Sequence, residues 1–285
     1  MNILYGLIFL FLAPLAGALV IGLDRKITAR MQGRVGPPIL QPIYDVLKLF
    51  EKEKVVVAKS QNMFVLSYLL FMAFTGALFF AGGDFLLVIF ALTLSHIFLV
   101  LGAYASHSPY SFLGAERELI QLMAFEPMII LIAAGMYLVD HSFYVSDIAR
   151  SQAPMILLLP GLFLGFVFVL TLKMRKSPFD LSTSHHAHQE IVKGITTEFS
   201  GSTLGRVEIA HWYETVLLLG FIYLFFAFSP PLAILAIALT YFFELLIDNI
   251  SPRFKWALAL ESAWAVALVL GMTNITALWL MRGVL

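Results

Sequence analysis

Eight long apolar stretches run along this chain, separated by shorter polar segments. Each is about 20 residues long, the length that an α-helix needs to cross the hydrocarbon core of a bilayer. Turn-forming residues such as Gly82-Gly83-Asp84 and Ser229-Pro230-Pro231 separate several of them. The stretches lie near residues 3–23, 63–81, 85–105, 118–139, 154–172, 207–229, 232–250 and 256–280. The pattern predicts an all-α integral membrane protein of about eight transmembrane helices, forming a single polytopic domain over residues 1–285.

The first long loop, residues 24–62, contains a second periodic pattern. Ile43, Val46, Leu47 and Phe50 recur at helical spacing, and Pro42 stands at a favourable first position of a helix. This predicts a short amphipathic helix that lies in the membrane interface or against a docked subunit. A solvated surface helix is the alternative.

Composition agrees with a membrane protein and limits its chemistry. Hydrophobic residues make up 60% of the chain and charged residues 13%, against about half and a quarter in soluble domains. The net charge of zero gives no indication of a nucleic-acid partner. The chain has no cysteine, which excludes disulfides and iron–sulfur ligation by its own thiolates. No basic segment precedes the first apolar stretch, so we expect a retained span rather than a signal peptide.

The basic residues predict the orientation in the membrane. Of the 18 lysines and arginines, only Arg150 and Arg282 fall on one side of the predicted spans. The others fall on the opposite side, most of them in the loops 24–62 and 173–206. By the positive-inside rule these loops are cytoplasmic and both termini lie outside.

Carboxylates inside the apolar stretches are the most informative polar residues. A charge at the bilayer centre costs about 2.5–3.5 kcal/mol, so we expect Glu126, Glu214 and Glu244 to face the bundle interior or water, or to be protonated. Carboxylates near helix ends can reach interfacial water instead; these are Glu208, Asp248 and Glu261. Buried carboxylates on several helices suit a proton or ion path, and hydrogen-bonded contacts that only lock helices together are the alternative.

Two further features add candidate chemistry. Pro127 follows Glu126 and frees the Met123 carbonyl, which predicts a kink and a polar pocket. The loop 182–190 carries His185, His186 and His188 with Glu190. These residues could bind a metal, but a proton relay or contact with a docked subunit is favoured, because histidine titrates near neutral pH.

Four separated motifs, in order, resemble the quinone-pocket membrane subunit of respiratory complex I. They are Asp24-Arg25-Lys26 with Arg34-Val35-Gly36-Pro37 and residues 40–48; Leu113-Gly114-Ala115 with Arg117, Gln121 and Glu126; Pro178-Phe179-Asp180 with Glu190, Gly194 and residues 197–201; and Ser251-Pro252-Arg253-Phe254. The similarity covers nearly the whole chain.

Departures from that pattern point to one branch of the family. Asp24 stands where complex I subunits usually have glutamate, and a Gly-Pro-Asn element before Arg34 is missing. The segment His185-His186-Ala187-His188 replaces closely spaced glutamates. This form resembles the energy-converting (Ech-type) membrane-bound nickel–iron hydrogenases of anaerobic bacteria and archaea, and the altered loop argues against a quinone pocket.

The resemblance implies a non-catalytic subunit of an oxidoreductase complex in the cytoplasmic membrane. It would anchor the hydrogenase large and small subunits, a ferredoxin-like iron–sulfur subunit and an antiporter-like membrane subunit. Iron–sulfur clusters and the nickel–iron centre would lie in those partners, with no cofactor in this chain. Ferredoxin oxidation would be coupled to hydrogen formation and to movement of H⁺ or Na⁺.

The resemblance and the carboxylate pattern together suggest the roles of individual residues. The ion path would use Glu126, Glu214 and Glu244, with Asp24, Glu116, Glu118, Asp180, Glu190 and Glu198 at its cytoplasmic mouth. Charge balance or subunit docking would fall to Arg25, Arg34, Arg117, Arg253, His185, His186 and His188. A quinone-binding complex I subunit is one alternative. A stand-alone secondary transporter is another, although such a transporter should show repeated halves and no repeat is visible.

Overall fold

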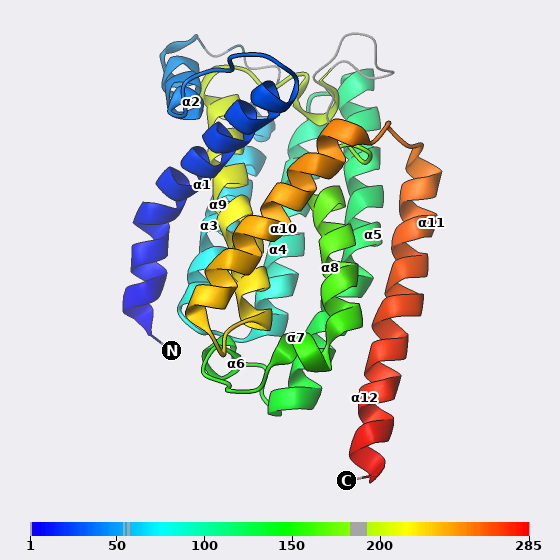
Figure 1. The fold of residues 1–285 in the computed structure, drawn as a ribbon. Coiled ribbons are helices and arrows are strands. Elements are labelled where there is room, and N and C mark those ends of the chain that lie inside the picture. Colours follow the sequence, from blue (N-terminus) through cyan, green and yellow to red (C-terminus); the bar gives the residue numbers. More distant parts are fainter. Residues whose placement is uncertain (1, 54, 56–57, 183–192, 285) are drawn as a thin grey trace.

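The computed structural model describes residues 2–53, 55, 58–182 and 193–284 and is helical throughout, without a strand in those residues. The predicted all-α membrane fold is confirmed (Figure 1). The longer helices are α1 (Ile3–Met31), α3 (Lys59–Phe80), α4 (Phe85–Tyr104), α5 (Pro109–Asp140), α8 (Pro160–Lys173), α9 (Gly201–Phe225), α10 (Pro230–Ile250) and α11 (Trp256–Val266), which continues through a π-helical segment (Ala267–Met272) into α12 (Thr273–Val284). The shorter ones are α2 (Gln41–Glu51), α6 (Val145–Ile148), α7 (Met155–Leu158) and a 3-10 turn (Gly194–Thr196).

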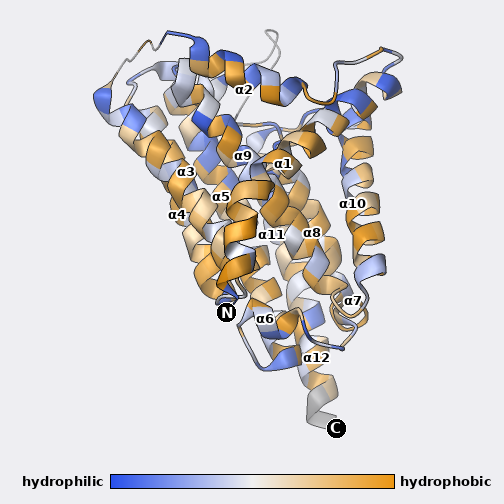
Figure 2. Ribbon diagram, turned by 90° about the vertical axis from the view of Figure 1, so that its left-hand side faces the viewer, coloured by the Kyte–Doolittle hydropathy of each residue, from blue (hydrophilic) through white to orange (hydrophobic). Residues whose placement is uncertain are grey.

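The crossing predicted over residues 154–172 differs from the others. Among the described residues, seven helices are long and apolar enough to span a membrane, and α8 is not one of them. Its 14 residues rise about 21 Å, less than the hydrocarbon thickness of about 30 Å. Pro160, which has no backbone N–H, separates α8 from α7. This crossing is therefore an interrupted pair of helices rather than one continuous span. Both chain ends lie at the same end of the bundle, as an even number of crossings requires (Figures 1 and 2).

Local sequence signals explain where several helices begin. Gly82, with φ of +78°, makes the turn after α3, a backbone conformation that favours glycine. The Asp84 carboxylate then accepts a hydrogen bond of 3.0 Å from the backbone N–H of Leu87 and caps α4. Pro230 stands in the first turn of α10, where its missing N–H has no helical partner to lose.

The bundle has a packed interior and an apolar outside. Large side chains such as Phe125, Phe166 and Phe221 are almost completely buried at its centre. In contrast, Phe11 of α1 and Ile234 of α10 are 76% and 68% exposed, which suits contact with lipid. Hydrophobic residues cover most of the helix lengths in Figure 2, and hydrophilic residues gather at the bundle ends, above all near α2.

The amphipathic helix predicted in the first loop is present as α2. Its residue Val46 is 6% exposed and packs against Ala18 of α1 and Trp212 of α9. Leu47 and Phe50 remain 55% and 46% exposed. One part of the apolar stripe thus covers the bundle, and the other part is available for lipid or a docked subunit.

Candidate functional site

A polar cavity of about 730 Å³ opens among α1, the end of α8, α9 and α10, at the α2 end of the bundle. Few of its lining residues are apolar. Its charged and polar lining residues include Asp24, Arg25, Arg34, Lys173, Arg175, Lys176, Asp180, Glu208, His211, Glu214, Tyr241 and Asp248. The cavity brings together charges that lie far apart in the sequence.

Three cations at the end of α8 organise this site. The side chains of Lys173, Arg175 and Lys176 are only 6%, 11% and 10% exposed. Each forms ion pairs with a different helix, so one short segment connects α8 to α1, α5 and α9. The sequence pattern assigns these residues to the cytoplasmic loop 173–206, whereas the structure places Lys173 in the last turn of α8 and buries all three side chains.

The backbone of Arg175 explains how consecutive side chains diverge. Its φ is +52°, in the left-handed region, and the residue follows the last helical turn of α8. The N–H of Arg175 donates to the Leu172 carbonyl (3.2 Å), and that of Lys176 donates to the Thr171 carbonyl (3.3 Å). These two bonds form a Schellman motif, whose left-handed residue is usually glycine. An arginine there costs about 1–2 kcal/mol of backbone strain, which the contacts of its guanidinium offset.

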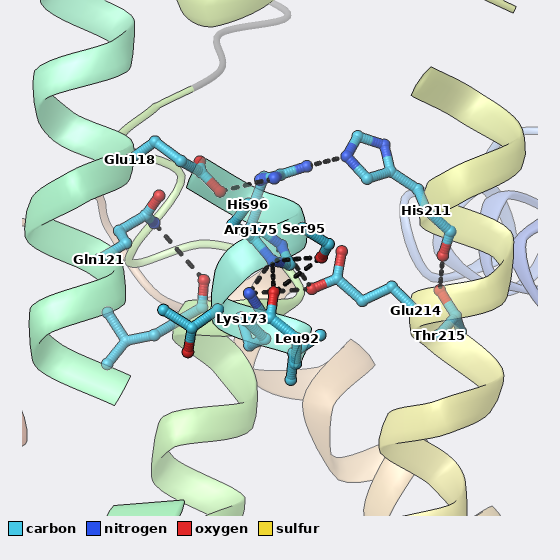
Figure 3. Close-up of polar contacts among 12 residues, drawn as sticks. Leu92, Ser95, His96, Glu118, Gln121, Lys173, Arg175, His211, Glu214 and Thr215 are labelled. Atoms are coloured by element: carbon cyan, nitrogen blue, oxygen red, sulfur yellow. Dashed lines mark hydrogen bonds and ion pairs between the residues drawn. The ribbon is translucent and has the colours of Figure 1, made fainter. Parts of the chain in front are cut away.

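Those contacts join Arg175 to α5 and α9. Its Nη2 donates to Oε1 of Glu118 at 2.7 Å, and its Nη1 donates to Nε2 of His211, as Figure 3 shows. Burial lowers the pKa of Arg175, but the neighbouring Glu118, Tyr68 and Glu214, together with the hydrogen bond to Glu118, outweigh burial and raise the pKa above its ordinary value. Arg175 is therefore a permanent charge, and His211, as the acceptor of its hydrogen bond, is neutral with its proton on Nδ1.

Lys173 lies deeper and forms a triad with Glu214 of α9 and His96 of α4 (Figure 3). The Lys173 Nζ is 3.1 Å from Oε1 of Glu214 and 2.7 Å from Nε2 of His96. The third side of the triangle, from His96 Nε2 to Glu214 Oε1, is 3.0 Å. All three residues are at least nine-tenths buried. Glu214 thus faces the bundle interior, as expected from the sequence.

Lys176 connects the cavity to α1 and α10. Its Nζ is 2.7 Å from Oδ2 of Asp24, and the same oxygen accepts a hydrogen bond of 2.8 Å from the Tyr241 hydroxyl. One residue further, the backbone N–H of Ser177 donates to Oδ1 of Asp248 at 2.9 Å. Asp24 and Asp248 therefore hold the segment after α8 by its side chains and backbone.

The Pro178-Phe179-Asp180 motif is held from two sides. Gln121 of α5 donates to the Phe179 carbonyl at 2.7 Å. Arg253 donates to the Asp180 carbonyl at 2.8 Å, and its Nε is 3.1 Å from the Asp180 carboxylate. Asp180 and Arg253, both singled out from the sequence, are thus ion-paired with each other.

Two other carboxylates of the proposed path lie apart from these ion pairs. Glu244 of α10 is fully buried, and neither of its oxygens has a hydrogen-bond partner among the described residues. Glu126 of α5 is only partly buried and, within the described part of the chain, makes no hydrogen bond or ion pair. It shares a helix face with Met123 and Ile130, which are 57% and 42% exposed. Glu126 therefore points toward the outside of this bundle rather than into the cavity.

The remaining predicted residues are spread around the α2 end. Glu116 accepts a hydrogen bond of 2.6 Å from the Tyr104 hydroxyl, and Arg25 pairs with Asp45 of α2 at 2.9 Å. Arg117 donates to the Leu181 carbonyl at 3.5 Å, and Arg34 hydrogen-bonds with Gln32. Glu198 is partly buried. The candidate residues His185, His186, His188 and Glu190 lie outside the described residues.

Comparison with known proteins identifies the family. A family model described as NADH dehydrogenase matches residues 4–279. The chain belongs to the NADH dehydrogenase family. Hydrogenase-4 component C of Escherichia coli K12 is 33% identical over 222 residues, covering 72% of this chain and 67% of that protein. A NADH-quinone oxidoreductase subunit of Thermomicrobium roseum is 30% identical over 308 residues, covering 91% and 89% of the two chains.

A solved structure shows that the fold is shared. One chain of the membrane-bound sulfane sulfur reductase, an archaeal respiratory membrane complex, matches with a TM-score of 0.84 at 24% identity. The match covers 95% of this chain and 98% of that one. The family resemblance inferred from the motifs is thus confirmed, and this chain is a multi-pass membrane subunit of a complex I-like or hydrogenase-4-like respiratory complex.

In this NADH dehydrogenase family member, the sequence pattern did not indicate His96 or His211 as site residues. It placed three further site residues in a loop and gave them no role in the site: Lys173, Arg175 and Lys176. His96 is a lone histidine in an apolar stretch, the one signal that could have drawn attention to it. Nothing in the sequence pairs Arg175 with Glu118, because 57 residues separate them.

Proposed function

We propose that this chain is the membrane subunit of an ion-translocating, ferredoxin-dependent nickel–iron hydrogenase. It anchors the hydrophilic redox subunits, which hold the iron–sulfur clusters and the nickel–iron centre, and it connects them to an antiporter-like membrane subunit. Electron transfer in the partners drives H⁺ or Na⁺ movement through polar groups of this chain. The α2 end faces the cytoplasm and both termini lie outside.

The character of the cavity carries this proposal. A quinone ring is typically held by apolar and aromatic side chains with a few polar groups. Here many of the lining side chains are charged, and they form ion pairs such as Asp24 with Lys176 and Glu214 with Lys173. Such a cavity favours the exchange of charges over the binding of a large apolar ring.

The sequence relatives keep a second candidate open, a quinone-reducing subunit of complex I. The similarity to the Thermomicrobium roseum oxidoreductase subunit covers more of this chain than the similarity to hydrogenase-4 component C does. The polar cavity and the similarity to hydrogenase-4 component C support the hydrogenase proposal. The stand-alone transporter has no such support, because these relatives are subunits of respiratory complexes.

The test is to purify the complex from native membranes and identify its subunits by mass spectrometry. We expect hydrogenase large and small subunits, and hydrogen formation from reduced ferredoxin that quinone-site inhibitors leave unchanged. Inhibitor-sensitive quinone reduction, with NADH-oxidising subunits in place of a hydrogenase, would overturn the proposal in favour of complex I.

A further inference from the structure

The protonation of His96 is constrained by its backbone neighbour. The His96 side chain is fully buried, and its Nδ1 lies 2.9 Å from the Leu92 carbonyl oxygen. A carbonyl oxygen only accepts hydrogen bonds, so Nδ1 carries a proton. Only Nε2 can therefore gain or lose a proton, and this atom faces Lys173 and Glu214.

Two protonation arrangements fit the distances around Nε2. With Lys173 as an ammonium, neutral His96 accepts a hydrogen bond from Nζ at 2.7 Å. With His96 as a cation, Nε2–H donates to the lone pair of a neutral Lys173 amine along the same 2.7 Å contact, and Nε2 stays 3.0 Å from Glu214 Oε1 as its ion-pair partner. Both arrangements hold one carboxylate and one cation, so moving the proton between them leaves the net charge of the buried triad unchanged.

We propose that Lys173 and His96 share one transferable proton above the Glu214 carboxylate, so that the ion handled at this site is H⁺ and not Na⁺. In the transfer an Nζ–H bond breaks, an Nε2–H bond forms, and no electrons are exchanged. This inference rests on the proposed role of the chain in ion translocation. It adds the identity of the ion and assigns the transfer to Lys173 and His96.

The placement of the triad gives the transfer a direction. Lys173 and Glu214 line the cavity, whereas His96, on α4, is not among its lining residues. A proton arriving from the cavity thus meets Lys173 first and His96 second. A sodium ion would need several oxygen ligands, but the Glu214 oxygen that faces this triad is already paired with two nitrogen groups.

The variants that test the proposal distinguish a Lys173 that only supplies positive charge from a Lys173 that releases a proton. Lys173→Arg keeps a cation beside Glu214 but cannot release a proton, and Lys173→Met removes both properties. His96→Gln keeps an acceptor for Lys173 without a titratable group. Lys193→Arg, at an exposed position outside the site, is the matched control for the lysine-to-arginine exchange.

The measurement is the rate of proton uptake into sealed vesicles, normalised to assembled complex, with the electron donor that the wild-type complex uses. We expect Lys173→Arg and Lys173→Met to slow proton uptake alike, and His96→Gln to slow it as well, each about a hundredfold, with Lys193→Arg unchanged. Rescue by Lys173→Arg relative to Lys173→Met would show a purely structural cation and overturn the proposal.

The proposal can still be tested if a variant fails to assemble or if the complex forms no hydrogen. If Lys173→Arg fails to assemble, normal proton uptake by assembled His96→Gln overturns the proposal, and its loss supports it. If the wild-type complex forms no hydrogen but translocates protons with another donor, the hydrogenase function fails while the proton-sharing proposal is still tested.

Discussion

The indole N–H of Trp264 in α11 donates a hydrogen bond of 3.1 Å to the backbone carbonyl of Met123 in α5. This carbonyl is the one that Pro127, four residues later, leaves without its helical partner. Unsatisfied backbone groups are costly in lipid, so Trp264 compensates for the proline and attaches α11 to the bundle. The Met123 carbonyl that Pro127 leaves free thus binds a neighbouring helix, α11.

Removing this bond tests its contribution. Trp264→Phe keeps an aromatic ring but loses the donor, and we expect it to lower the free energy of unfolding by about 1–3 kcal/mol. Thermal unfolding of the purified complex in detergent measures the effect. Trp279→Phe is the control, because Trp279 is 66% exposed on α12. Equal stability of the two variants would contradict the assignment.

A substitution at Arg175 compares the free-energy cost of its left-handed backbone with the stability that its ion pair with Glu118 contributes. Arg175→Gly relieves backbone strain of about 1–2 kcal/mol but leaves Glu118 buried without its cation, which costs about 3–5 kcal/mol. We therefore expect a net loss of stability of about 1–4 kcal/mol. Adding Glu118→Gln should recover part of it, measured as a double-mutant cycle by thermal unfolding. No recovery in the double variant would mean that the ion pair is not the source of the loss.

Glu126 carries the clearest prediction about coupling. Its outward position means that a partner membrane subunit must cover it, or that it meets lipid at a cost of about 2.5–3.5 kcal/mol. Glu126→Gln keeps hydrogen bonding without proton exchange. We expect reduced ion uptake per hydrogen in vesicles, with normal assembly and iron–sulfur content. The control is Glu261→Gln, at an exposed carboxylate on α11; wild-type uptake and rate in the Glu126 variant would remove Glu126 from the path.

The orientation can be measured directly, because the chain has no cysteine of its own. Single cysteines at Glu53, near α2, and at Tyr144, beside α6, occupy exposed positions at opposite ends of the bundle. A membrane-impermeant maleimide added to intact cells should label Tyr144→Cys and leave Glu53→Cys unlabelled until the membrane is opened. The reverse pattern would invert the topology.

The amino-acid sequence by itself determined that the long helices form, whereas α1 runs on to Met31 and α5 begins at Pro109, beyond the predicted stretches 3–23 and 118–139. Hydrophobic length, the turn at Gly82-Gly83-Asp84 and the amphipathic spacing in α2 are local properties, so they can be read without knowledge of the fold. The motifs also placed the chain in its family. The sequence predicted a continuous span over residues 154–172, whereas Pro160 interrupts the helix there.

Only the tertiary structure decided which charges meet. Lys176 and Asp24 are 152 residues apart in the chain, yet their charged atoms lie 2.7 Å from each other. The left-handed backbone at Arg175 and the depth at which α8 ends turn a basic stretch that resembles a solvated loop into the centre of a buried network. Helix rotation directs Glu214 inward and Glu126 outward, although both are glutamates in apolar stretches. Such pairings depend on how helices pack around one another, which the spacing of residues along one helix does not specify.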